Sequence, residues 1–452
     1  PGRQDGMHPR PSLTTLDAVA LTVGLVVGSG IFRAPQLVAA NTGSVDLFLG
    51  VWVLGGLISL IGAFCYVELT TAYPHAGGEY HFLRRAFGSD LAFLFAWSRS
   101  SVIQTGSLAI LAYVFADYLA PVLSLGPRSS PVLAVVAVVG LTGLNLAGLR
   151  HGKRTQVVLT TVELVGLGAV IVAGLFFLEG PSNPEPLTDG GGGGLAGIGL
   201  ALVFVLLTYG GWNEAAYISA EVRDGPRAMS RTLLLGIGII TTLYLLANLA
   251  YVHALGLTGV ASSSVVAADV MHAAMGPWGA TLLSLAVAIA ALTSANATII
   301  TGARATYALG RDFGAFQFLG RWNDRDNTPI NALFLQAAVA LGLVAFGAVA
   351  RSGFEAMVAY TAPVFWFFLA LAALSVIVLR QREPERVRPY RVPLYPLTPL
   401  IFFGAAVFML YASIRYAGSG ALIGVAVMLA GVPVLLLVRA RARRPVERPG
   451  PG

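Results

Sequence analysis

Charged residues are scarce in this sequence, and that scarcity decides the class of protein. Only 11% of the 452 residues are Asp, Glu, Lys or Arg, whereas 56% are hydrophobic. An ordinary globular chain carries roughly 25% charged residues, so this composition excludes a soluble enzyme and a disordered chain. Cysteine is nearly absent as well, since Cys65 is the only one, which excludes a fold held by internal disulfides. The composition therefore indicates a protein that lies in a lipid bilayer.

Long apolar runs are what the sequence contains instead. A helix that spans a bilayer needs about 20 such residues, whereas a barrel strand would show about ten residues of alternating polarity. The runs predict an all-α membrane protein with twelve transmembrane helices. They cover residues 14–40, 46–73, 89–120, 131–149, 155–178, 195–222, 230–256, 277–308, 330–350, 355–379, 395–416 and 418–438.

The runs leave little room for a separate soluble domain. We expect a cytoplasmic N-terminal segment at 1–13, a single twelve-helix membrane domain at 14–438 and a basic cytoplasmic tail at 439–452. The first run has some features of a signal peptide, because Arg3 and Arg10 precede it. Eleven further runs favour a retained helix.

The distribution of positive charge predicts the orientation. With the N-terminus in the cytoplasm, the cytoplasmic segments contain 23 of the 29 Lys and Arg residues, and the external loops contain three. This bias follows the positive-inside rule and predicts cytoplasmic N- and C-termini, as in a multi-pass protein of a bacterial inner membrane. Arginines that face anionic lipid headgroups explain the net charge of +7. We therefore expect membrane lipids, and no nucleic acid, among the partners.

Two apolar runs carry glycines and polar residues in their middle. Gly28-Ser29-Gly30 interrupts the first run, and Tyr209-Gly210-Gly211-Trp212-Asn213-Glu214 interrupts the sixth. Glycine costs about 1 kcal/mol relative to alanine inside a helix, so both stretches favour unwinding. Close helix packing is the alternative, because Gly24 and Gly28 have the GxxxG spacing. Paired broken helices, however, are typical of the substrate site of secondary transporters.

A broken helix suits an amino acid as ligand. Backbone N–H groups near Gly30 and Ile31, at the positive end of a helix, would bind a carboxylate. Carbonyl groups would accept hydrogen bonds from the ammonium group. We expect these carbonyls around Leu25, Val26, Leu207 and Gly210. A zwitterion would then need no charged side chain.

Several motifs in order give the chain a family resemblance. It resembles the amino acid–polyamine–organocation (APC) superfamily, and most of all the bacterial permeases related to the L-type amino acid transporters. The resemblance implies a LeuT-like 5+5 inverted repeat with helices 1 and 6 broken at mid-membrane, alternating access and no enzymatic chemistry. Its repeats would be about 14–178 and 195–379, followed by helices 11 and 12 at about 395–438. The matching motifs are Gly28-Ser29-Gly30-Ile31-Phe32, Tyr66-Val67-Glu68-Leu69, Gly77-Gly78-Glu79-Tyr80, Tyr209-Gly210-Gly211-Trp212-Asn213 and Ala303-Arg304-Ala305-Thr306-Tyr307.

The motifs and the chemistry of the breaks together predict the function. We expect a transporter of small or medium neutral L-amino acids, working as an exchanger or a proton symporter, with no metal and no cofactor. A cationic amino acid or a polyamine is the alternative substrate, attracted by Glu214 or Glu163. An intramembrane enzyme is remote, because the chain has neither His-Glu-x-x-His nor Gly-x-Ser-x-Gly. The predicted substrate-binding residues are Val26, Ser29, Gly30, Ile31, Leu207, Gly210, Trp212, Asn213 and Glu214.

Three positions depart from what the resemblance implies. Leu207 stands where L-type transporters usually have an aromatic gate, so it would set the size limit of the pocket. Arg33 stands where a small or apolar residue is common. Glu163 stands where many relatives have a lysine that substitutes for sodium, and we expect it to couple transport to protons. An ion pair with Arg33, or a neutral carboxyl bonded to backbone, are the alternatives for Glu163. Trp212 would wall the pocket or take part in ordinary packing.

Other residues are expected to have supporting roles. Glu68, Glu221 and Arg304 lie towards the ends of their runs, which favours structural or gating ion pairs. Cys65 lies within the second run, so we expect no disulfide-linked partner subunit. The 74–89 connection is too polar to span and predicts a short surface helix with its aromatic side chains in the lipid interface.

Overall fold

The fold is a bundle of helices. The computed structural model describes residues 14–28, 30–75, 77–147, 153–180, 194–214, 216, 225–313, 316–323, 328–350, 352–416 and 418–442. Within these residues the only β-type pairing is one isolated bridge between Asn323 and Thr328. The chain is all-helical, as predicted.

The helices follow the apolar runs closely. In the first half they are α1 (Thr15–Val26), α2 (Gly30–Thr42), α3 (Val45–Ala72), α4 (Gly78–Phe87), α5 (Ser89–Ser98), η1 (Arg99–Ile103), α6 (Gln104–Val122), η2 (Pro127–Ser129), α7 (Ser130–Leu146), α8 (Lys153–Val172) and η3 (Ala173–Phe177). In the second half they are α9 (Leu195–Thr208), η4 (Trp212–Glu214), α11 (Gly225–Ser262), α12 (Val266–Asp312), α13 (Ile330–Ala348), α14 (Gly353–Arg382), α15 (Leu397–Tyr416) and α16 (Ser419–Ala442).

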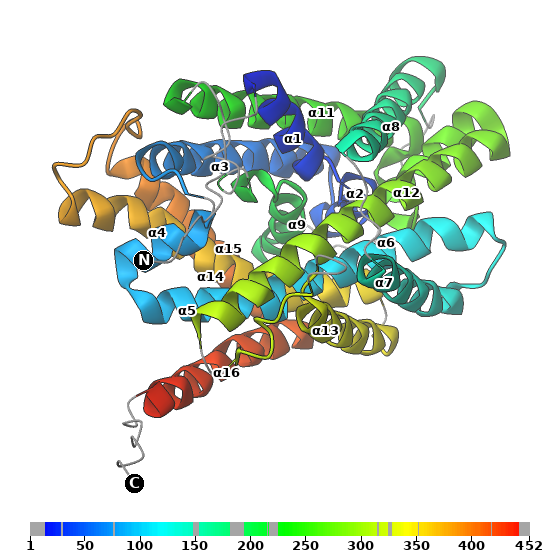
Figure 1. The fold of residues 1–452 in the computed structure, drawn as a ribbon. Coiled ribbons are helices and arrows are strands. Elements are labelled where there is room, and N and C mark those ends of the chain that lie inside the picture. Colours follow the sequence, from blue (N-terminus) through cyan, green and yellow to red (C-terminus); the bar gives the residue numbers. More distant parts are fainter. Residues whose placement is uncertain are drawn as a thin grey trace, which may run out of the picture.

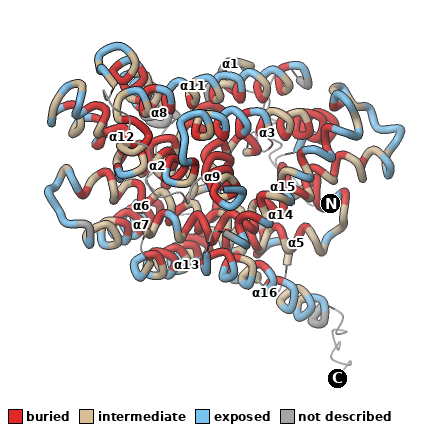
Figure 2. Tube along the Cα trace, turned by 180° about the vertical axis from the view of Figure 1, so that it is seen from behind, coloured by how far each residue is buried: buried red, intermediate tan, exposed pale blue. Residues whose placement is uncertain are grey.

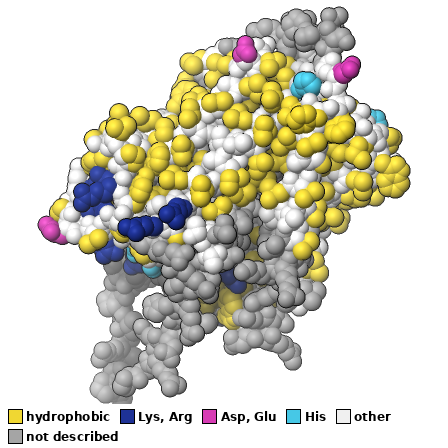
Figure 3. Space-filling view, turned by 90° about the horizontal axis from the view of Figure 1, so that it is seen from above, with side chains coloured by type: hydrophobic (Ala, Val, Ile, Leu, Met, Phe, Trp, Pro, Cys, Tyr) yellow, Lys and Arg dark blue, Asp and Glu magenta, His cyan; other side chains and the backbone are white. Residues whose placement is uncertain are grey.

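Ten helices in the described part of the chain are long and apolar enough to cross a bilayer. Two predicted spans fall outside this count. The first is divided between α1 and α2, and the fourth forms α7, a helix of 17 residues. Hydrophobic side chains cover most of the face in Figure 3, while the Lys and Arg side chains gather towards one edge.

The core lies where the broken helices meet. In Figure 1, α9 runs through the middle of the bundle, between α3 on one side and α14 on the other, and it contacts α2, α3, α14 and α15. Burial follows the same pattern in Figure 2, where α9 is mostly buried and the outer turns of α16 are exposed. The bundle therefore encloses the second break.

The segment between the seventh and eighth predicted spans differs from the prediction. The sequence assigned 257–276 to a connection, but α11 continues to Ser262 and α12 begins at Val266. Both helices change direction at a glycine with a positive φ, Gly256 at 69° and Gly276 at 70°. Glycine adopts this backbone without steric cost, so each long helix contains a sharp corner that hydropathy alone does not indicate.

The predicted surface helix is present as α4, but part of the prediction was wrong. The side chain of Phe82 is completely buried in the protein core rather than lying in a lipid interface, because α4 packs against α5 and α14. Glu79 on the same helix is buried as well. This short helix is therefore an integral part of the core.

Candidate functional site

The first break lies between α1 and α2. The amide N–H of Val27 still donates to Val23, but that of Gly28 donates to the carbonyl oxygen of Val26, only two residues back. The helix resumes at Gly30, where the N–H groups of the first turn have no acceptor within the helix. Ser29 lies outside the described residues. The first turn of α2 therefore has N–H groups without an acceptor in their own helix at the position where the sequence predicts a carboxylate site.

The second break follows α9. The helix ends at Thr208, Gly210 donates to the carbonyl oxygen of Leu207, and the short turn of η4 begins at Trp212. Gly211 has a φ of 107°, a conformation that a residue with a Cβ rarely adopts. The glycine at this position is what allows the chain to turn away from the helix axis.

The two breaks touch each other. A Cβ placed on Gly30 would lie 3.1 Å from Cγ2 of Thr208 and 3.3 Å from its Cα. The buried hydroxyl of Tyr244 on α11 lies 2.8 Å from the carbonyl oxygen of Val26 and 3.2 Å from that of Thr208. The single hydroxyl hydrogen of Tyr244 therefore lies between the carbonyl groups at the ends of the two broken helices, and the shorter of the two contacts is to Val26.

Some of the carbonyl groups that were expected to bind an ammonium group already have partners. The carbonyl oxygen of Val26 accepts from Gly28 and from Tyr244, and that of Leu207 accepts from Gly210. A carbonyl oxygen has two lone pairs, so Val26 is saturated in this conformation.

A cavity of about 300 Å³ opens beside the breaks. Such a volume lies at the lower end of the range for small-molecule sites. Its walls come from the two broken helices and from α6, α12 and α14. The lining residues are Gly24, Val26, Gly28, Gly30, Ala34, Ile103, Gln104, Ser107, Ile110, Leu111, Phe204, Leu207, Thr208, Gly210, Gly211, Asn213, Glu214, Ser294, Ala297, Thr298, Thr301, Phe354, Val358, Thr361 and Phe365.

Six of the nine predicted substrate residues line this cavity. They are Val26, Gly30, Leu207, Gly210, Asn213 and Glu214. Ile31 is fully buried outside the lining. Trp212 packs edge-on against Tyr66, with ring centroids 5.0 Å apart, and so occupies the packing position that the sequence left open as an alternative.

The sequence missed the polar residues that α6, α12 and α14 contribute. Gln104 and Ser107 on α6, and Ser294 and Thr298 on α12, line the cavity together with Thr361. Their spacing carried a weak signal, because residues three or four apart share one face of a helix. Single Ser and Thr residues are also common packing residues in membrane helices, so the signal was not specific.

Glu214 faces the cavity but is not free. Nη2 of Arg99 donates to both of its carboxylate oxygens, at 3.0 and 2.9 Å. Nη1 of the same arginine lies 4.0 Å from Oε2 of Glu79. Glu79 also accepts hydrogen bonds from Tyr66 and from Asn213. Burial raises the pKa of Glu79 above its usual range, although Arg99 opposes this effect. The floor of the cavity is thus an ion-pair network that joins α4, η1 and η4.

Glu163 and Arg33 lie apart from this network. Arg33 forms an ion pair with Asp117 at 3.6 Å and donates to the carbonyl oxygen of Ser264, so the structure contradicts the alternative in which it pairs with Glu163. Glu163 on α8 is buried, and its Oε1 has no hydrogen-bond partner among the described residues. Glu163 lies on α8, which packs against α11, the helix that carries Tyr244.

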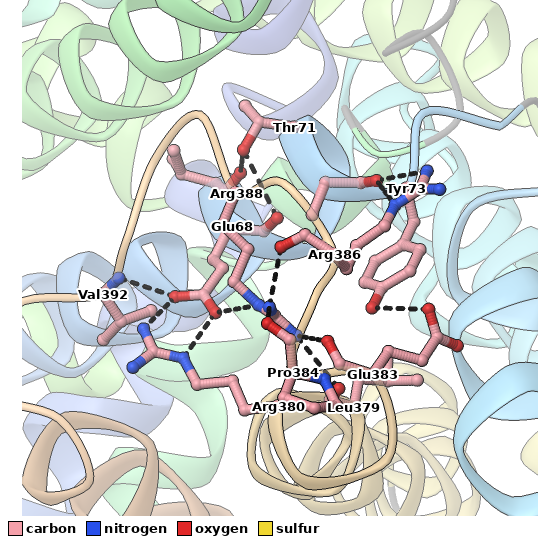
Figure 4. Close-up of polar contacts among 12 residues, drawn as sticks. Glu68, Thr71, Tyr73, Leu379, Arg380, Glu383, Pro384, Arg386, Arg388 and Val392 are labelled. Atoms are coloured by element: carbon pink, nitrogen blue, oxygen red, sulfur yellow. Dashed lines mark hydrogen bonds and ion pairs between the residues drawn. The ribbon is translucent and has the colours of Figure 1, made fainter.

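A second ionic cluster holds the end of α3. Arg380 donates to both oxygens of Glu68 at 2.7 and 2.5 Å, and the amide of Val392 donates to one of them (Figure 4). Nε of Arg388 lies 3.6 Å from Oε1 of Glu68. The structural ion pair that the sequence favoured for Glu68 is therefore present. Glu221 lies outside the described residues.

Metal ligands are not grouped in the described part of the chain. No cluster of three or more His, Cys, Asp or Glu side chains there could hold a metal ion. The site is instead a small, mostly neutral cavity between two interrupted helices.

Comparison with known proteins agrees with this geometry. The chain matches the "Amino acid permease" family over residues 13–438. It is 30% identical over 405 residues to the b(0,+)-type amino acid transporter 1 of Mus musculus, covering 88% of this chain and 82% of the relative. The same protein of Rattus norvegicus is 31% identical, with equal coverage. The Large neutral amino acids transporter small subunit 2 of Mus musculus is 29% identical over 447 residues, covering 96% and 82%. The chain is therefore a multi-pass integral membrane protein of the amino acid permease family, in the APC superfamily, and a transporter rather than an enzyme.

Proposed function

We propose that this permease transports small or medium neutral L-amino acids by alternating access. The observation that carries the proposal is the charge of the cavity. Among its described lining residues the only ionisable side chain is Glu214, and Arg99 neutralises it. A zwitterion with an uncharged side chain would enter this cavity without leaving an uncompensated charge in the membrane.

In the proposed architecture, twelve spans form an inverted repeat. The broken pair α1–α2 is one span and α7 is another, and together with the ten long helices they make twelve. Both termini lie in the cytoplasm of a bacterium. The first repeat would cover about 14–178 and the second about 195–379, with helices 11 and 12 at about 395–438. Each repeat then begins with a broken helix, α1–α2 in one and α9–η4 in the other, which is the arrangement of many secondary transporters.

In this mechanism the N–H groups at the start of α2 bind the substrate carboxylate. The backbone of the second break and the acceptor oxygens of the cavity wall bind the ammonium group. Leu207 limits the size of the side chain. Relative movement of the broken helices then exposes the site to one side of the membrane and then to the other.

A cationic amino acid or polyamine is less well supported. It would need an unpaired carboxylate in the cavity, and both oxygens of Glu214 accept from Arg99. The relatives do not separate the two substrate classes, since they include both a b(0,+)-type amino acid transporter and a Large neutral amino acids transporter. A covalent partner subunit is not part of the proposal, because Cys65 is fully buried in α3.

Uptake into proteoliposomes tests the substrate class. All twenty amino acids and a polyamine would compete with a radiolabelled neutral amino acid. We expect competition from neutral amino acids and little from lysine, arginine or putrescine. Preferential competition by the cations would overturn the proposal.

We further propose that Glu163 couples transport to protons. Its burial on α8, and the packing of α8 against α11, whose Tyr244 hydroxyl contacts Val26, would let a change in its charge act on the end of α1. Glu163→Gln mimics the protonated form. It should retain exchange of internal for external substrate and lose accumulation driven by a pH gradient. Wild-type uptake that ignores the gradient, or accumulation that persists in the variant, would give Glu163 a structural role.

A further inference from the structure

Gln104 is an uncommitted carboxamide in the lining of the cavity. The residue is only 7% exposed and lines the cavity. Its side-chain nitrogen and oxygen form no hydrogen bond with a described residue, and they are not among the buried polar atoms that are sealed from the cavity. A carboxamide in this state has two donors and an acceptor that are open to a ligand.

The backbone before Gln104 is unusual as well. The segment Arg99–Ile103 is a π-helix, and the amide of Gln104 donates to the carbonyl oxygen of Arg99, five residues earlier. Short π-helical turns inside α-helices are frequent at functional sites, because they change which side chains face a cavity. Gln104 is the first residue after this turn.

The threonine hydroxyls and the other carboxamide of the wall are already engaged, whereas the hydroxyls of Ser107 and Ser294 line the cavity beside Gln104. The hydroxyls of Thr208, Thr298, Thr301 and Thr361 each donate to the carbonyl group four residues earlier in their own helix, at 2.8 to 2.9 Å. The amide nitrogen of Asn213 donates to Glu79, and its oxygen accepts from Gly211. Among the described lining residues, Gln104 is thus the only carboxamide whose donor and acceptor are both available.

The surroundings of Gln104 are neutral and largely apolar. Ser107 lies one turn further along the same face of α6. The remaining lining from η1, α6 and α14 consists of Ile103, Ile110, Leu111, Phe354, Val358 and Phe365 together with Thr361. A charged substrate side chain would find no counter-ion there. An aliphatic one would cover the carboxamide and leave its polar atoms unpaired, which is unfavourable.

We infer that Gln104 selects the substrate side chain, and that this permease prefers neutral amino acids with a hydroxyl or carboxamide group over aliphatic amino acids of the same size. The inference rests on the proposed function, since it takes this cavity as the amino acid site. Sites built to hydrogen-bond a substrate group discriminate strongly against analogues that lack it.

Pairs of amino acids with nearly equal shape test the inference. Asparagine and leucine form one pair, and threonine and valine the other. Kinetics of uptake into proteoliposomes would be measured for wild type, for Gln104→Met and for the control Gln336→Met. Gln336 is also a buried glutamine, but it lies on α13 outside the cavity lining and donates to the carbonyl oxygen of Thr298.

We expect the wild type to favour the polar member of each pair by about tenfold or more in kcat/KM, because a tenfold ratio corresponds to one ordinary hydrogen bond. Gln104→Met should remove most of this preference through a higher KM for asparagine and threonine, and Gln336→Met should keep it. If the wild type transports amino acids without a polar preference, or if the preference survives in Gln104→Met, the inference about Gln104 is overturned and the proposed function is not affected. Absence of any amino acid transport by the wild type would instead refute the proposed function.

Discussion

The hydroxyl of Tyr244 lies 2.8 Å from the carbonyl oxygen of Val26, the last residue of α1. That carbonyl group has lost the partner that a continuous helix would provide at position 30. The hydroxyl also lies 3.2 Å from the carbonyl oxygen of Thr208, the last residue of α9. The hydroxyl of this tyrosine therefore bridges the point where the broken ends meet, and its one hydrogen is best placed for the carbonyl oxygen of Val26.

Removing that hydroxyl should affect both stability and transport. Tyr244→Phe leaves a buried carbonyl group short of a donor, which costs about 1–3 kcal/mol, and should lower uptake about tenfold with a raised KM. Tyr113→Phe is a matched control, because the buried hydroxyl of Tyr113 donates to the carbonyl oxygen of Val344 outside the cavity. The midpoint temperature of thermal unfolding should fall by a similar amount in both variants. An equal loss of uptake in the two would show that Tyr244 acts only through general stability.

The contact between Gly30 and Thr208 should be sensitive to a single methyl group. In Gly30→Ala the new Cβ would lie 3.1 Å from Cγ2 of Thr208, so the breaks must separate or the methyl group must fill part of the cavity. We expect substrate binding, measured by scintillation proximity, to weaken at least about tenfold while the protein remains extractable. Gly50→Ala on α3 has no atom within 4 Å and should bind normally. Normal binding by Gly30→Ala would remove this break from the site.

The ion pair between Arg99 and Glu214 should set the charge selectivity. Arg99→Gln leaves the Glu214 carboxylate facing the cavity without its bidentate partner, so lysine uptake should rise while leucine uptake falls. The double variant Arg99→Gln, Glu214→Gln has no such charge and should again prefer neutral substrates. If Arg99→Gln discriminates against lysine as the wild type does, Glu214 does not contact the substrate.

Much of the fold could be predicted from the sequence because hydrophobic run length reports helices directly. The breaks at Gly28–Gly30 and after Thr208 were also predictable, because each is caused by glycines within the apolar run itself, which the local sequence shows. The partner of Glu214 was not, because Arg99 lies 115 residues away in the chain, and only the folding of the whole bundle brings the two side chains together. The predicted runs end at 256 and begin at 277, next to the corners at Gly256 and Gly276, but the helical segments within the 257–276 connection were missed because hydropathy does not distinguish them.

Acid pH should destabilise the protein through His81. Its ring stacks on that of His75, with centroids 4.2 Å apart. Burial, followed by the positive charge of His75 and nearby arginines, lowers the pKa of His81 to about 4, against roughly 6.5 in an unfolded chain. Between these values the unfolded state binds a proton that the folded state does not, so stability is fully present above about pH 6.5 and falls towards pH 4.

The thermal midpoint in detergent, followed from pH 8 to pH 4, measures this effect. His81→Gln should flatten the decline between pH 6.5 and pH 4, whereas His272→Gln, at an exposed position on α12, should follow the wild type. A decline of equal size in His81→Gln would assign the acid sensitivity to other groups.

Substrate protection of an introduced cysteine tests most directly whether amino acids bind in the cavity between the breaks. Cys65 is the only cysteine and is fully buried, so a Cys65→Ala variant provides a background without native thiols that could be labelled. Ser294→Cys places a thiol on the cavity wall, and Ser89→Cys places one at the exposed start of α5. The account predicts that a saturating neutral amino acid slows methanethiosulfonate labelling at position 294 about tenfold or more and leaves position 89 unchanged. Equal labelling at position 294 with and without a transported substrate would contradict it.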